Sequence, residues 1–485
     1  MSIIFGTDGW RGIIADDFTF ANVALVARAA AQFYKTQAFA KTGVVVGYDA
    51  RFLSRQFAQL VARVFADERI PVLLTNGIAS TPQVSLAAQA KCMAGGVIIT
   101  ASHNPAEYNG FKLKSCHGGP STPEDIAAVQ NNVATLESTP AVAAAFASGL
   151  PAFDVLVERG MIKYFDAKTE YIEYLKSKIN FEAIRGAGIK VLYDPMHGSG
   201  INTLHLLMPD ADQIHNEFNP SFGELDHPEP LGEYLGTLME KMKTGSYSIG
   251  IATDGDADRL GAVDENGNFI DSHRVFVLLM KYLYEDRGQK GAVAKTISLT
   301  AMIDEYCRKN NITMYETPIG FKYIAKLMTA EKIVIGGEES GGLGTMLHIP
   351  ERDGIFNGLL LMEMMATRGK SLGELSRELD DEFGIHRYRR IDQHMTVEQK
   401  DAILARAKEG LTTLGSMPVT RASTLDGYKF FTEHGWLLIR ASGTEPLLRF
   451  YSEADSEAHV EELLKAGITL GERIQESGVR SQNNS

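Results

Sequence analysis

Paired cysteines and long apolar runs are both missing from this sequence. Cys92, Cys116 and Cys307 lie far apart, which excludes the closely spaced cysteines of a disulfide framework, a zinc ribbon or a thioredoxin-like redox motif. No uncharged apolar stretch approaches the roughly 20 residues that a membrane helix needs, and the N-terminus lacks the basic and apolar segments of a signal peptide. These absences predict a cytoplasmic protein with no membrane partner, whose cysteines are buried thiols.

A surplus of positive charge is also missing. The chain carries 61 acidic and 48 basic residues, a formal net charge of −13, which argues against a nucleic-acid partner. An apolar content of 44% is ordinary for a globular protein. The 485 residues are too many for one hydrophobic core and, at roughly 100 to 200 residues per domain, predict about three to four domains.

One pattern of strands and helices occurs three times along the chain. Short β-branched runs alternate with amphipathic stretches, which predicts βαβ units and largely parallel sheets. The first copy has a predicted helix over residues 20–34 and predicted strands over 44–49 and 70–74, and a helix from about 164 to 179 opens the second. From about Phe383 the pattern becomes α+β. We therefore predict three similar mixed α/β domains and a C-terminal α+β domain, with limits 1–150, 151–268, 269–382 and 383–485.

The first copy ends in the loop 100–105, TASHNP. Pro105 cannot continue a strand, so Ser102 is expected at the carboxyl end of a strand, the edge at which open α/β sheets bind ligands. A hydroxyl there, beside His103 and ten residues before Lys112, is a candidate nucleophile. The alternative is an ordinary turn serine or a helix N-cap.

The second copy ends in alternating carboxylates, Asp254, Asp256 and Asp258. Three carboxylates brought together repel one another unless a cation lies among them, so the loop predicts a Mg²⁺ site. The adjacent Arg259 suits the binding of phosphoryl oxygens. A calcium EF-hand is excluded, because its sixth position needs the glycine that Arg259 replaces and because a predicted strand precedes the loop. A solvated charged turn is the remaining alternative.

Two further loops carry groups that suit a sugar phosphate. Glu338 and Ser340 lie among glycines in the third copy and offer an acceptor and a hydroxyl, the groups that hold sugar hydroxyls. In the C-terminal region, residues 440–444 (RASGT) combine an arginine, two hydroxyls and a glycine amide, which are donors for a phosphate monoester. The alternatives are a solvated loop acid and a plain hairpin turn.

These four motifs, in this order and over essentially the whole length, resemble those of the α-D-phosphohexomutase family. The family includes phosphoglucomutases, phosphomannomutases and phosphoglucosamine mutases. The resemblance implies four domains around a central cleft, the last with a TATA-box-binding-protein-like fold. It also implies that a phosphoserine interconverts hexose 1-phosphate and hexose 6-phosphate through a hexose 1,6-bisphosphate, which acts as the activator.

The resemblance further implies a role for each matching residue. Ser102 is the expected phosphoserine, and its phosphate is expected to bind Mg²⁺ with the three aspartates. Arg11, Lys112 and Arg259 match positive positions around the reacting phosphoryl group, and Lys112 and His103 are the candidates for acid–base catalysis. The expected substrate-binding residues are Glu338, Ser340, Gly320, Lys322, Arg352, Arg440, Ser442, Gly443 and Thr444.

Two positions depart from the family pattern. Ala257 stands where many relatives have glycine, which is tolerated if its φ is negative. Gly342 stands where bacterial mannose-type and glucosamine-type members often have histidine, and the segments 317–322 and 348–354 look closer to phosphoglucomutases. The resemblance therefore favours glucose phosphates, acted on by a monomer or homodimer, with mannose and glucosamine phosphates as alternatives. A metal-dependent sugar phosphatase and a non-catalytic sugar-phosphate-binding regulator are more distant alternatives.

Overall fold

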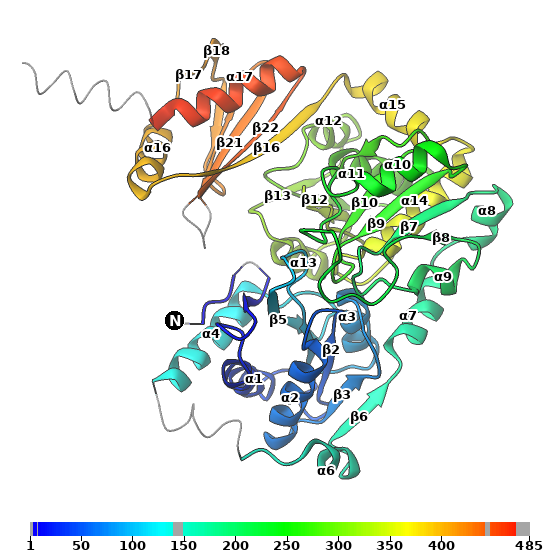
Figure 1. Cartoon of the computed structure of the whole chain (residues 1–485). Helices are drawn as coiled ribbons and strands as arrows, with labels where there is room; N and C mark the ends of the chain where they lie inside the picture. The colour runs from blue at the N-terminus through cyan, green and yellow to red at the C-terminus, as the bar shows by residue number, and fades with distance from the viewer. Residues whose placement is uncertain (1–2, 7, 139–148, 442–446, 472–485) are drawn as a thin grey trace, which may run out of the picture. The chain divides into compact units, whose positions relative to one another are not determined.

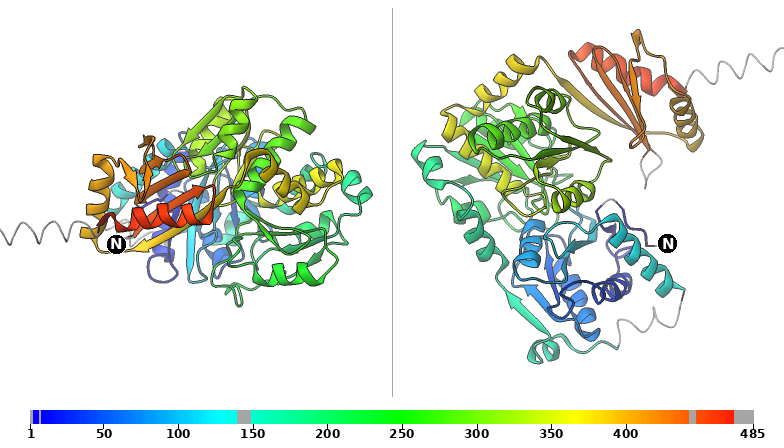
Figure 2. Two further views of the ribbon diagram at one scale, coloured as in Figure 1. Left: turned by 90° about the horizontal axis from the view of Figure 1, so that it is seen from above. Right: turned by 180° about the vertical axis from the view of Figure 1, so that it is seen from behind.

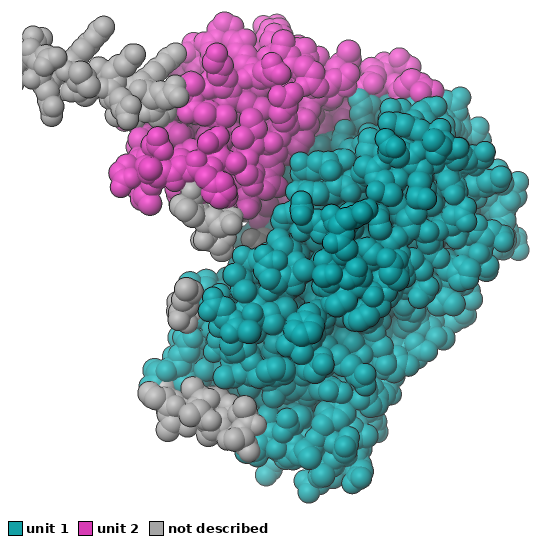
Figure 3. All heavy atoms as spheres, viewed as in Figure 1, with its two compact units in different colours: residues 1–295, 313–315, 320–376 teal, residues 296–312, 316–319, 377–485 magenta. Residues whose placement is uncertain are grey.

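The computed structural model describes residues 3–6, 8–138, 149–441 and 447–471. The chain forms two compact units, one of residues 1–295, 313–315 and 320–376 and the other of residues 296–312, 316–319 and 377–485 (Figure 3). In the described residues, no helix is long and apolar enough to cross a membrane.

The first sheet has six strands in the order β1-β5-β4-β2-β3-β6 (Figure 1). Strands β2, β3, β4 and β6 run parallel, whereas β1 and β5 are antiparallel to their neighbours. The strand bounds are β1 (Trp10–Ile13), β2 (Val44–Tyr48), β3 (Val72–Thr75), β4 (Gly95–Ile99), β5 (Tyr108–Ser115) and β6 (Ile162–Phe165).

Helices cover both faces of this sheet (Figures 1 and 2). Side chains of a strand alternate between faces, and β2 follows this rule. Val44 and Val46 pack into one core with residues of α1, α2 and α4, whereas Val45 packs with residues of α3 on the other face. The helix bounds are α1 (Phe20–Tyr34), α2 (Ser54–Asp67), α3 (Thr81–Ala90), α4 (Pro123–Glu137), α6 (Phe153–Glu158) and α7 (Ala167–Lys176).

The second sheet has the order β11-β10-β9-β7-β8, with β7, β8 and β9 parallel. Leu238 and Met242 of α10 pack with Leu192 of β7 in one core, and α14 contacts β9 and β10. The strands are β7 (Val191–Asp194), β8 (Asp212–Gln213), β9 (Ile249–Thr253), β10 (Leu260–Val263) and β11 (Phe269–Ile270). The helices are α8 (Phe181–Gly186), α9 (Thr203–Leu207), α10 (Gly236–Thr244), α11 (Ser272–Lys281) and α14 (Gly354–Arg368).

The third sheet has the order β13-β12-β14-β15, with β12 and β14 parallel and β15 antiparallel to β14. Phe321 and Ile324 of α13 pack with Ala294 of β12. The strands are β12 (Ala292–Thr296), β13 (Met314–Thr317), β14 (Ile333–Gly337) and β15 (Leu343–Thr345). The helices are the π-helical turn Tyr282–Asp286, α12 (Met302–Lys309), α13 (Phe321–Ala330) and α15 (Leu372–Phe383).

The fourth sheet is antiparallel throughout, in the order β16-β22-β21-β20-β19. Its core contains Ile403 of α16 and Val460 and Leu463 of α17. The strands are β16 (Arg387–His394), β19 (Arg421–Ser423), β20 (Tyr428–Phe431), β21 (Gly435–Ala441), β22 (Leu447–Ala454) and the separate pair β17 (Thr413–Leu414) and β18 (Met417–Pro418). The helices are α16 (Val397–Glu409), α17 (Glu457–Ile468) and the 3₁₀ turn Thr469–Gly471.

The predicted fold class is confirmed: three mixed α/β sheets precede a C-terminal antiparallel sheet with helices. The helix predicted over residues 20–34 is α1. The helix predicted from residue 164 is wrong at its start, because Tyr164 lies in β6 and pairs with Leu74 of β3. Strand β6 belongs to the first sheet although it lies beyond residue 150, the predicted end of the first domain. The four domain limits stay a prediction.

Candidate active site

Ser102 lies in the loop just beyond the carboxyl end of β4, as its sequence position predicts. The side chain is buried, and its backbone φ of 53° falls in the left-handed region that non-glycine residues rarely adopt. Two contacts hold this conformation: the Ser102 amide donates to Thr100 Oγ1 over 2.9 Å, and the Arg51 guanidinium donates to the Ser102 carbonyl over 2.7 Å. The loop therefore presents the hydroxyl in a fixed place.

The hydroxyl of Ser102 donates a hydrogen bond of 2.7 Å to Asp254 Oδ2. Asp254, Asp256 and Asp258 follow β9 at the edge of the second sheet, and one carboxylate oxygen of each lies within 4.8 Å of the others. The candidate nucleophile and the three candidate metal ligands therefore form one cluster, as the sequence predicts.

This cluster fits a metal ion. All three aspartates are fully buried, and Asp256 Oδ1 and Asp258 Oδ1 have no hydrogen-bond partner in the described part of the chain. Burial, followed by the charges of Asp256 and Asp258, raises the pKa of Asp254 well above its ordinary value. Buried carboxylate oxygens without donors are the hard ligands that a divalent cation such as Mg²⁺ requires.

Close backbone packing joins the serine loop to the aspartate loop. A Cβ at Gly255 would lie 2.3 Å from the Ser102 carbonyl oxygen, so only glycine fits there. Thr81, the first residue of α3, donates its amide to the Asp256 carbonyl over 3.0 Å and its hydroxyl to the Asp256 carboxylate. These contacts fix the spacing between the first and second sheets at the site.

The expectation that Ala257 has a negative φ is wrong. Its φ is +57°, in the left-handed region that favours glycine. The Ala257 carbonyl accepts the amide of Gly354 over 3.1 Å, and a Cβ at Gly354 would lie 2.1 Å from the Arg259 carbonyl oxygen. The start of α14 therefore packs against the aspartate loop and holds Ala257 in this backbone conformation.

Lys112 of β5 is buried among carboxylates. Its Nζ lies 2.8 Å from Asp256 Oδ2, 2.9 Å from Asp8 Oδ2 and 3.3 Å from Asp258 Oδ2. Burial lowers the pKa of Lys112, but the carboxylates of Asp256, Asp258 and Asp8 outweigh it and raise the pKa above its ordinary value. Lys112 is therefore a permanently charged ammonium in this arrangement.

Arg352 joins the aspartate loop to the third sheet. Its guanidinium lies 2.6 Å from Asp258 Oδ2, 2.6 Å from Asp8 Oδ2 and 3.3 Å from Glu338 Oε2. A Cβ at Gly342 would lie 2.4 Å from Arg352 Cδ, so the absence of a side chain at position 342 leaves room for this arginine.

Glu338 follows β14 and is buried. Burial raises its pKa to about 7, although Arg352 opposes the shift. The loop closes on itself, since the Glu338 amide donates to the Gly342 carbonyl over 3.0 Å, and Ser340 is half-buried within it. Gly341, with φ +88°, accepts the Leu260 amide over 3.1 Å, which ties this loop to the strand that follows the aspartates.

Further cations surround Ser102. Arg259 forms an ion pair of 2.6 Å with Glu229, and Arg11 of β1 donates to the side chain of Asn104. His103 Nδ1 lies 3.5 Å from Ser102 Oγ. Burial, then the nearby charges of Arg259, Arg11, Lys112 and Arg51, lowers the pKa of His103 well below its ordinary value. The imidazole is therefore neutral beside the serine.

The remaining predicted residues lie in other places. Gly320 precedes α13 with φ +131°, and burial lowers the pKa of Lys322 in the first turn of that helix, although Asp8 opposes the shift. Arg440 of β21, in the second unit, donates to Asp426 Oδ2 over 2.9 Å. Ser442, Gly443 and Thr444 lie outside the described residues, so the phosphate loop stays a prediction.

Sequence reasoning missed three residues that hold the site together: Asp8, Arg51 and Thr81. Asp8 binds both Lys112 and Arg352, and no spacing in the glycine-rich opening indicates this. Arg51 had a usable signal, because it follows the carboxyl end of β2, the strand beside β4. Neighbouring parallel strands bring such ends together, so Arg51 could have been grouped with Ser102.

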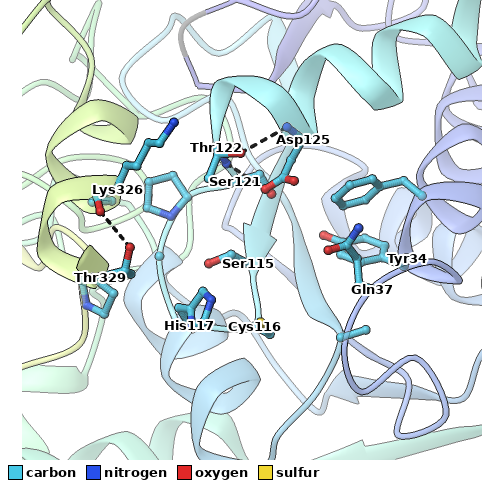
Figure 4. Close-up of a pocket in the computed structure, with 16 residues that line it drawn as sticks. Tyr34, Gln37, Ser115, Cys116, His117, Ser121, Thr122, Asp125, Lys326 and Thr329 are labelled. Carbon is cyan, nitrogen blue, oxygen red and sulfur yellow. Dashed lines mark hydrogen bonds between the residues drawn. The ribbon is translucent and has the colours of Figure 1, made fainter.

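A separate hollow of about 220 Å³ lies at the opposite end of β4 and β5 (Figure 4). Tyr34 and Gln37 line one side of it and Lys326 and Thr329 another. None of the predicted site residues that the structure describes lines this hollow. It is therefore distinct from the carboxylate cluster.

Family models match this chain in four consecutive segments. They describe phosphoglucomutase/phosphomannomutase alpha/beta/alpha domain I over residues 2–140, domain II over 169–267, domain III over 271–383 and the C-terminal domain over 390–467. The order agrees with the order of the four sheets.

Individual relatives match over nearly the whole length. A phosphoglucomutase/phosphomannomutase of Thermococcus kodakarensis is 31% identical over 473 residues, which cover 97% of this chain and 98% of the relative. A phosphoglucosamine/phosphogalactosamine mutase of Sulfurisphaera tokodaii is 29% identical over 94% of this chain and 96% of its own. The crystal structure of a Thermus thermophilus protein named as a phosphomannomutase superposes with a TM-score of 0.83 at 32% identity, covering 97% of this chain and 99% of that one. The chain therefore belongs to the phosphoglucomutase/phosphomannomutase family of isomerases.

Proposed function

We propose that the protein interconverts hexose 1-phosphate and hexose 6-phosphate, with glucose as the preferred sugar, by way of a phosphorylated Ser102. One observation carries the proposal: the Ser102 hydroxyl donates to Asp254, which clusters with Asp256 and Asp258. The Oδ1 atoms of Asp256 and Asp258 have no hydrogen-bond donor among the described residues. A nucleophilic hydroxyl beside a divalent-cation site is the arrangement that reversible phosphoryl transfer needs.

The proposed reaction conserves phosphate. The free hydroxyl oxygen of the bound sugar phosphate attacks the phosphorus of phosphoserine 102 and gives its proton to His103. The bond from phosphorus to Ser102 Oγ breaks, and this leaving oxygen takes up a proton to become the serine hydroxyl. The resulting hexose 1,6-bisphosphate turns over and returns its other phosphate to Ser102 by the reverse step, which restores the phosphoserine. A bisphosphate that escapes leaves Ser102 unphosphorylated, so added hexose 1,6-bisphosphate acts as an activator.

Charged side chains of the chain hold the transferring group. Asp254, Asp256, Asp258 and the Ser102 phosphate would bind Mg²⁺, which when bound offsets negative charge on the phosphoryl oxygens. Lys112, Arg259 and Arg11 add fixed positive charge. Because Lys112 stays protonated among three carboxylates, we assign it to charge stabilisation and assign the sugar's proton to the neutral His103.

The non-reacting parts of the substrate need their own contacts. We assign the sugar hydroxyls to Glu338 and Ser340, with Arg352, Gly320 and Lys322 beside them. The distal phosphate is assigned to Arg440 with Ser442, Gly443 and Thr444. Because either phosphate must reach Ser102, these contacts must accept the sugar in two orientations, which favours a few hydroxyl contacts over a tightly shaped pocket.

The preference for glucose rests on Gly342 and the segments 317–322 and 348–354, and phosphomannomutase or phosphoglucosamine mutase activity is the alternative. The test compares kcat/KM for glucose, mannose and glucosamine 1-phosphates at saturating Mg²⁺ with a trace of the matching bisphosphate. We expect the highest value for glucose. A higher value for either other sugar overturns the preference and leaves the mutase assignment in place.

Replacing the nucleophile tests the mutase assignment. We expect Ser102→Ala to lower kcat by about a thousandfold or more while it still binds sugar phosphate. The matched control is Ser121→Ala, which removes another buried hydroxyl, one that has no partner within the described residues and lines the separate hollow. Wild-type turnover in Ser102→Ala, or an equal loss in Ser121→Ala, would rule the assignment out.

A metal-dependent phosphatase is the alternative enzyme class that must be distinguished from a mutase. It would use Ser102 with water as the final acceptor, so inorganic phosphate would accumulate from glucose 1-phosphate without glucose 6-phosphate. Among the described residues, the cluster at Ser102 contains aspartates and no histidine ligand, which does not favour a dinuclear phosphatase site. A cytoplasmic location and a monomeric or homodimeric state stay predictions.

A further inference from the structure

A second group of potential metal ligands lies in the fourth sheet. It consists of His434 in the turn between β20 and β21, Asp455 directly after β22, and His459 in the first turn of α17. One ligand atom from each residue lies within 4.8 Å of the others. The proposed reaction uses none of the three.

Both imidazoles face the same carboxylate. His434 Nδ1 lies 2.9 Å from Asp455 Oδ2, and His459 Nδ1 lies 2.5 Å from Asp455 Oδ1. The two rings are 4.1 Å apart between centroids and inclined by 31°. Ligands at about 2.0 to 2.1 Å from a tetrahedral Zn²⁺ are separated by about 3.3 Å, so small side-chain rotations bring these atoms to metal-binding distances.

The backbone around the three residues is tightly held. The Asp455 amide donates to the His434 carbonyl over 3.0 Å, and a Cβ at Gly435 would lie 2.1 Å from the Glu453 carbonyl oxygen. The Ser456 side chain caps α17 by accepting the His459 amide. The ligands therefore come from a turn, a strand end and a helix start that are already fixed against one another, which lowers the cost of organising a site.

The charge and donor types indicate the kind of ion. Imidazole nitrogens from two histidines together with one carboxylate suit first-row transition metals, whereas Mg²⁺ prefers oxygen ligands alone. All three side chains are partly exposed, at 40%, 51% and 31%, so an ion can reach them and keep a water as its remaining ligand.

We propose that His434, Asp455 and His459 form a binding site for a divalent transition-metal ion of the Zn²⁺ class. The site is separate from the predicted phosphate loop, because Arg440 follows His434 by six residues of extended strand, about 20 Å. A bound ion would cross-link the turn, β22 and α17, and so stabilise the fourth sheet.

Zinc binding to the full-length protein tests this proposal. Titrations are performed in excess Mg²⁺ on an Asp256→Asn background, which weakens Zn²⁺ binding at the aspartate cluster. We expect about one equivalent of Zn²⁺ with micromolar affinity, and at least tenfold weaker binding in His434→Ala and in His459→Ala. The matched control is His394→Ala, an exposed histidine of β16, which should bind Zn²⁺ as the background does. The proposal would be overturned if the His434 and His459 variants bound Zn²⁺ as tightly as the Asp256→Asn background does, or if that background bound no Zn²⁺.

Cobalt spectroscopy provides a test that needs neither histidine variant and so does not depend on how well those variants fold. Co²⁺ bound by two imidazoles and a carboxylate with low coordination absorbs visible light strongly, whereas Co²⁺ held by oxygen ligands in octahedral geometry absorbs weakly. We expect the strong bands in the Asp256→Asn protein and their loss on adding Zn²⁺. Weak bands alone would show that the histidines do not bind the ion. Neither result depends on mutase activity, so failure here leaves the proposed function untouched.

Discussion

A Cβ atom at Gly342 would lie 2.4 Å from Cδ of Arg352. The glycine therefore sets the position of an arginine that pairs with Asp8, Asp258 and Glu338. The ion pairs of Arg352 therefore depend on the absence of a side chain at position 342.

We expect Gly342→Ala to displace Arg352 and to lower kcat/KM by about tenfold or more, which corresponds to about 1.4 kcal/mol of transition-state stabilisation. The matched control is Gly236→Ala at the start of α10, where an added Cβ meets nothing within 4 Å. Steady-state kinetics of both variants check this prediction, and equal values for Gly342→Ala and wild type would contradict it.

Activity should depend on the ionisation of Glu338. Its pKa is about 7 because of burial, against an ordinary 4.5, so the carboxyl is neutral below that pH and ionised above it. The groups that act on it are Arg352, Glu339, Arg259 and Asp258. If the carboxylate accepts sugar hydroxyls, kcat/KM rises as the pH rises through about 7. Glu338→Gln, measured over the same range, should keep only the rise due to ionisation of the substrate phosphate near pH 6. An unchanged profile in this variant would exclude the role.

The same shift predicts a pH dependence of stability. The folded chain binds the Glu338 proton more tightly than the unfolded chain does, because its folded-state pKa is the higher one. Stability is therefore lost as the pH rises from about 4.5 to about 7. Urea unfolding of Glu338→Gln at several pH values should show a smaller loss over that interval than wild type, and an equal loss would argue against a raised pKa.

Asp256 should control metal dependence. Its carboxylate is a proposed Mg²⁺ ligand and also pairs with Lys112. We expect Asp256→Asn to raise the Mg²⁺ concentration needed for half-maximal activity and to lower kcat by at least about a hundredfold. Asp210→Asn, at an exposed position, is the matched control. A Mg²⁺ titration that coincides with wild type would remove Asp256 from the proposed ligand set.

Ala257 stores backbone strain in the aspartate loop. A left-handed alanine costs about 1 to 2 kcal/mol relative to glycine, while glycine costs about 0.5 to 1 kcal/mol through the entropy of the unfolded chain. We expect Ala257→Gly to leave the free energy of unfolding unchanged or to raise it by up to about 1.5 kcal/mol. Ala134→Gly, at an exposed position within α4, should instead lower it by about 1 kcal/mol. Urea unfolding measures the free energy of unfolding of both variants. A similar decrease in Ala257→Gly and Ala134→Gly would show that Ala257 is not strained.

The loops that follow the buried strands were predictable from sequence, whereas the contacts that join these loops to distant segments of the chain were not. Runs such as residues 97–99 and 248–252 predict buried strands, and the residues after them predict what lies at the sheet edge. The antiparallel pairing of β1 with β5, which places Asp8 and Arg11 at the site, leaves no periodic signal in a four-residue strand. The sign of φ at Ala257 was equally inaccessible, because contacts from Gly354 hold it.

Asp8 and Arg352 are paired although 344 positions separate them along the chain. During translation the residues around Ser102 emerge early, but this arginine leaves the ribosome only after most of the protein has been made. Until then, Asp8, Asp258 and Glu338 lack one of their counterions, and the acidic centre has incomplete charge compensation. We therefore expect the catalytic centre to mature late in biosynthesis, only once residue 352 has emerged from the ribosome and can pair with these carboxylates.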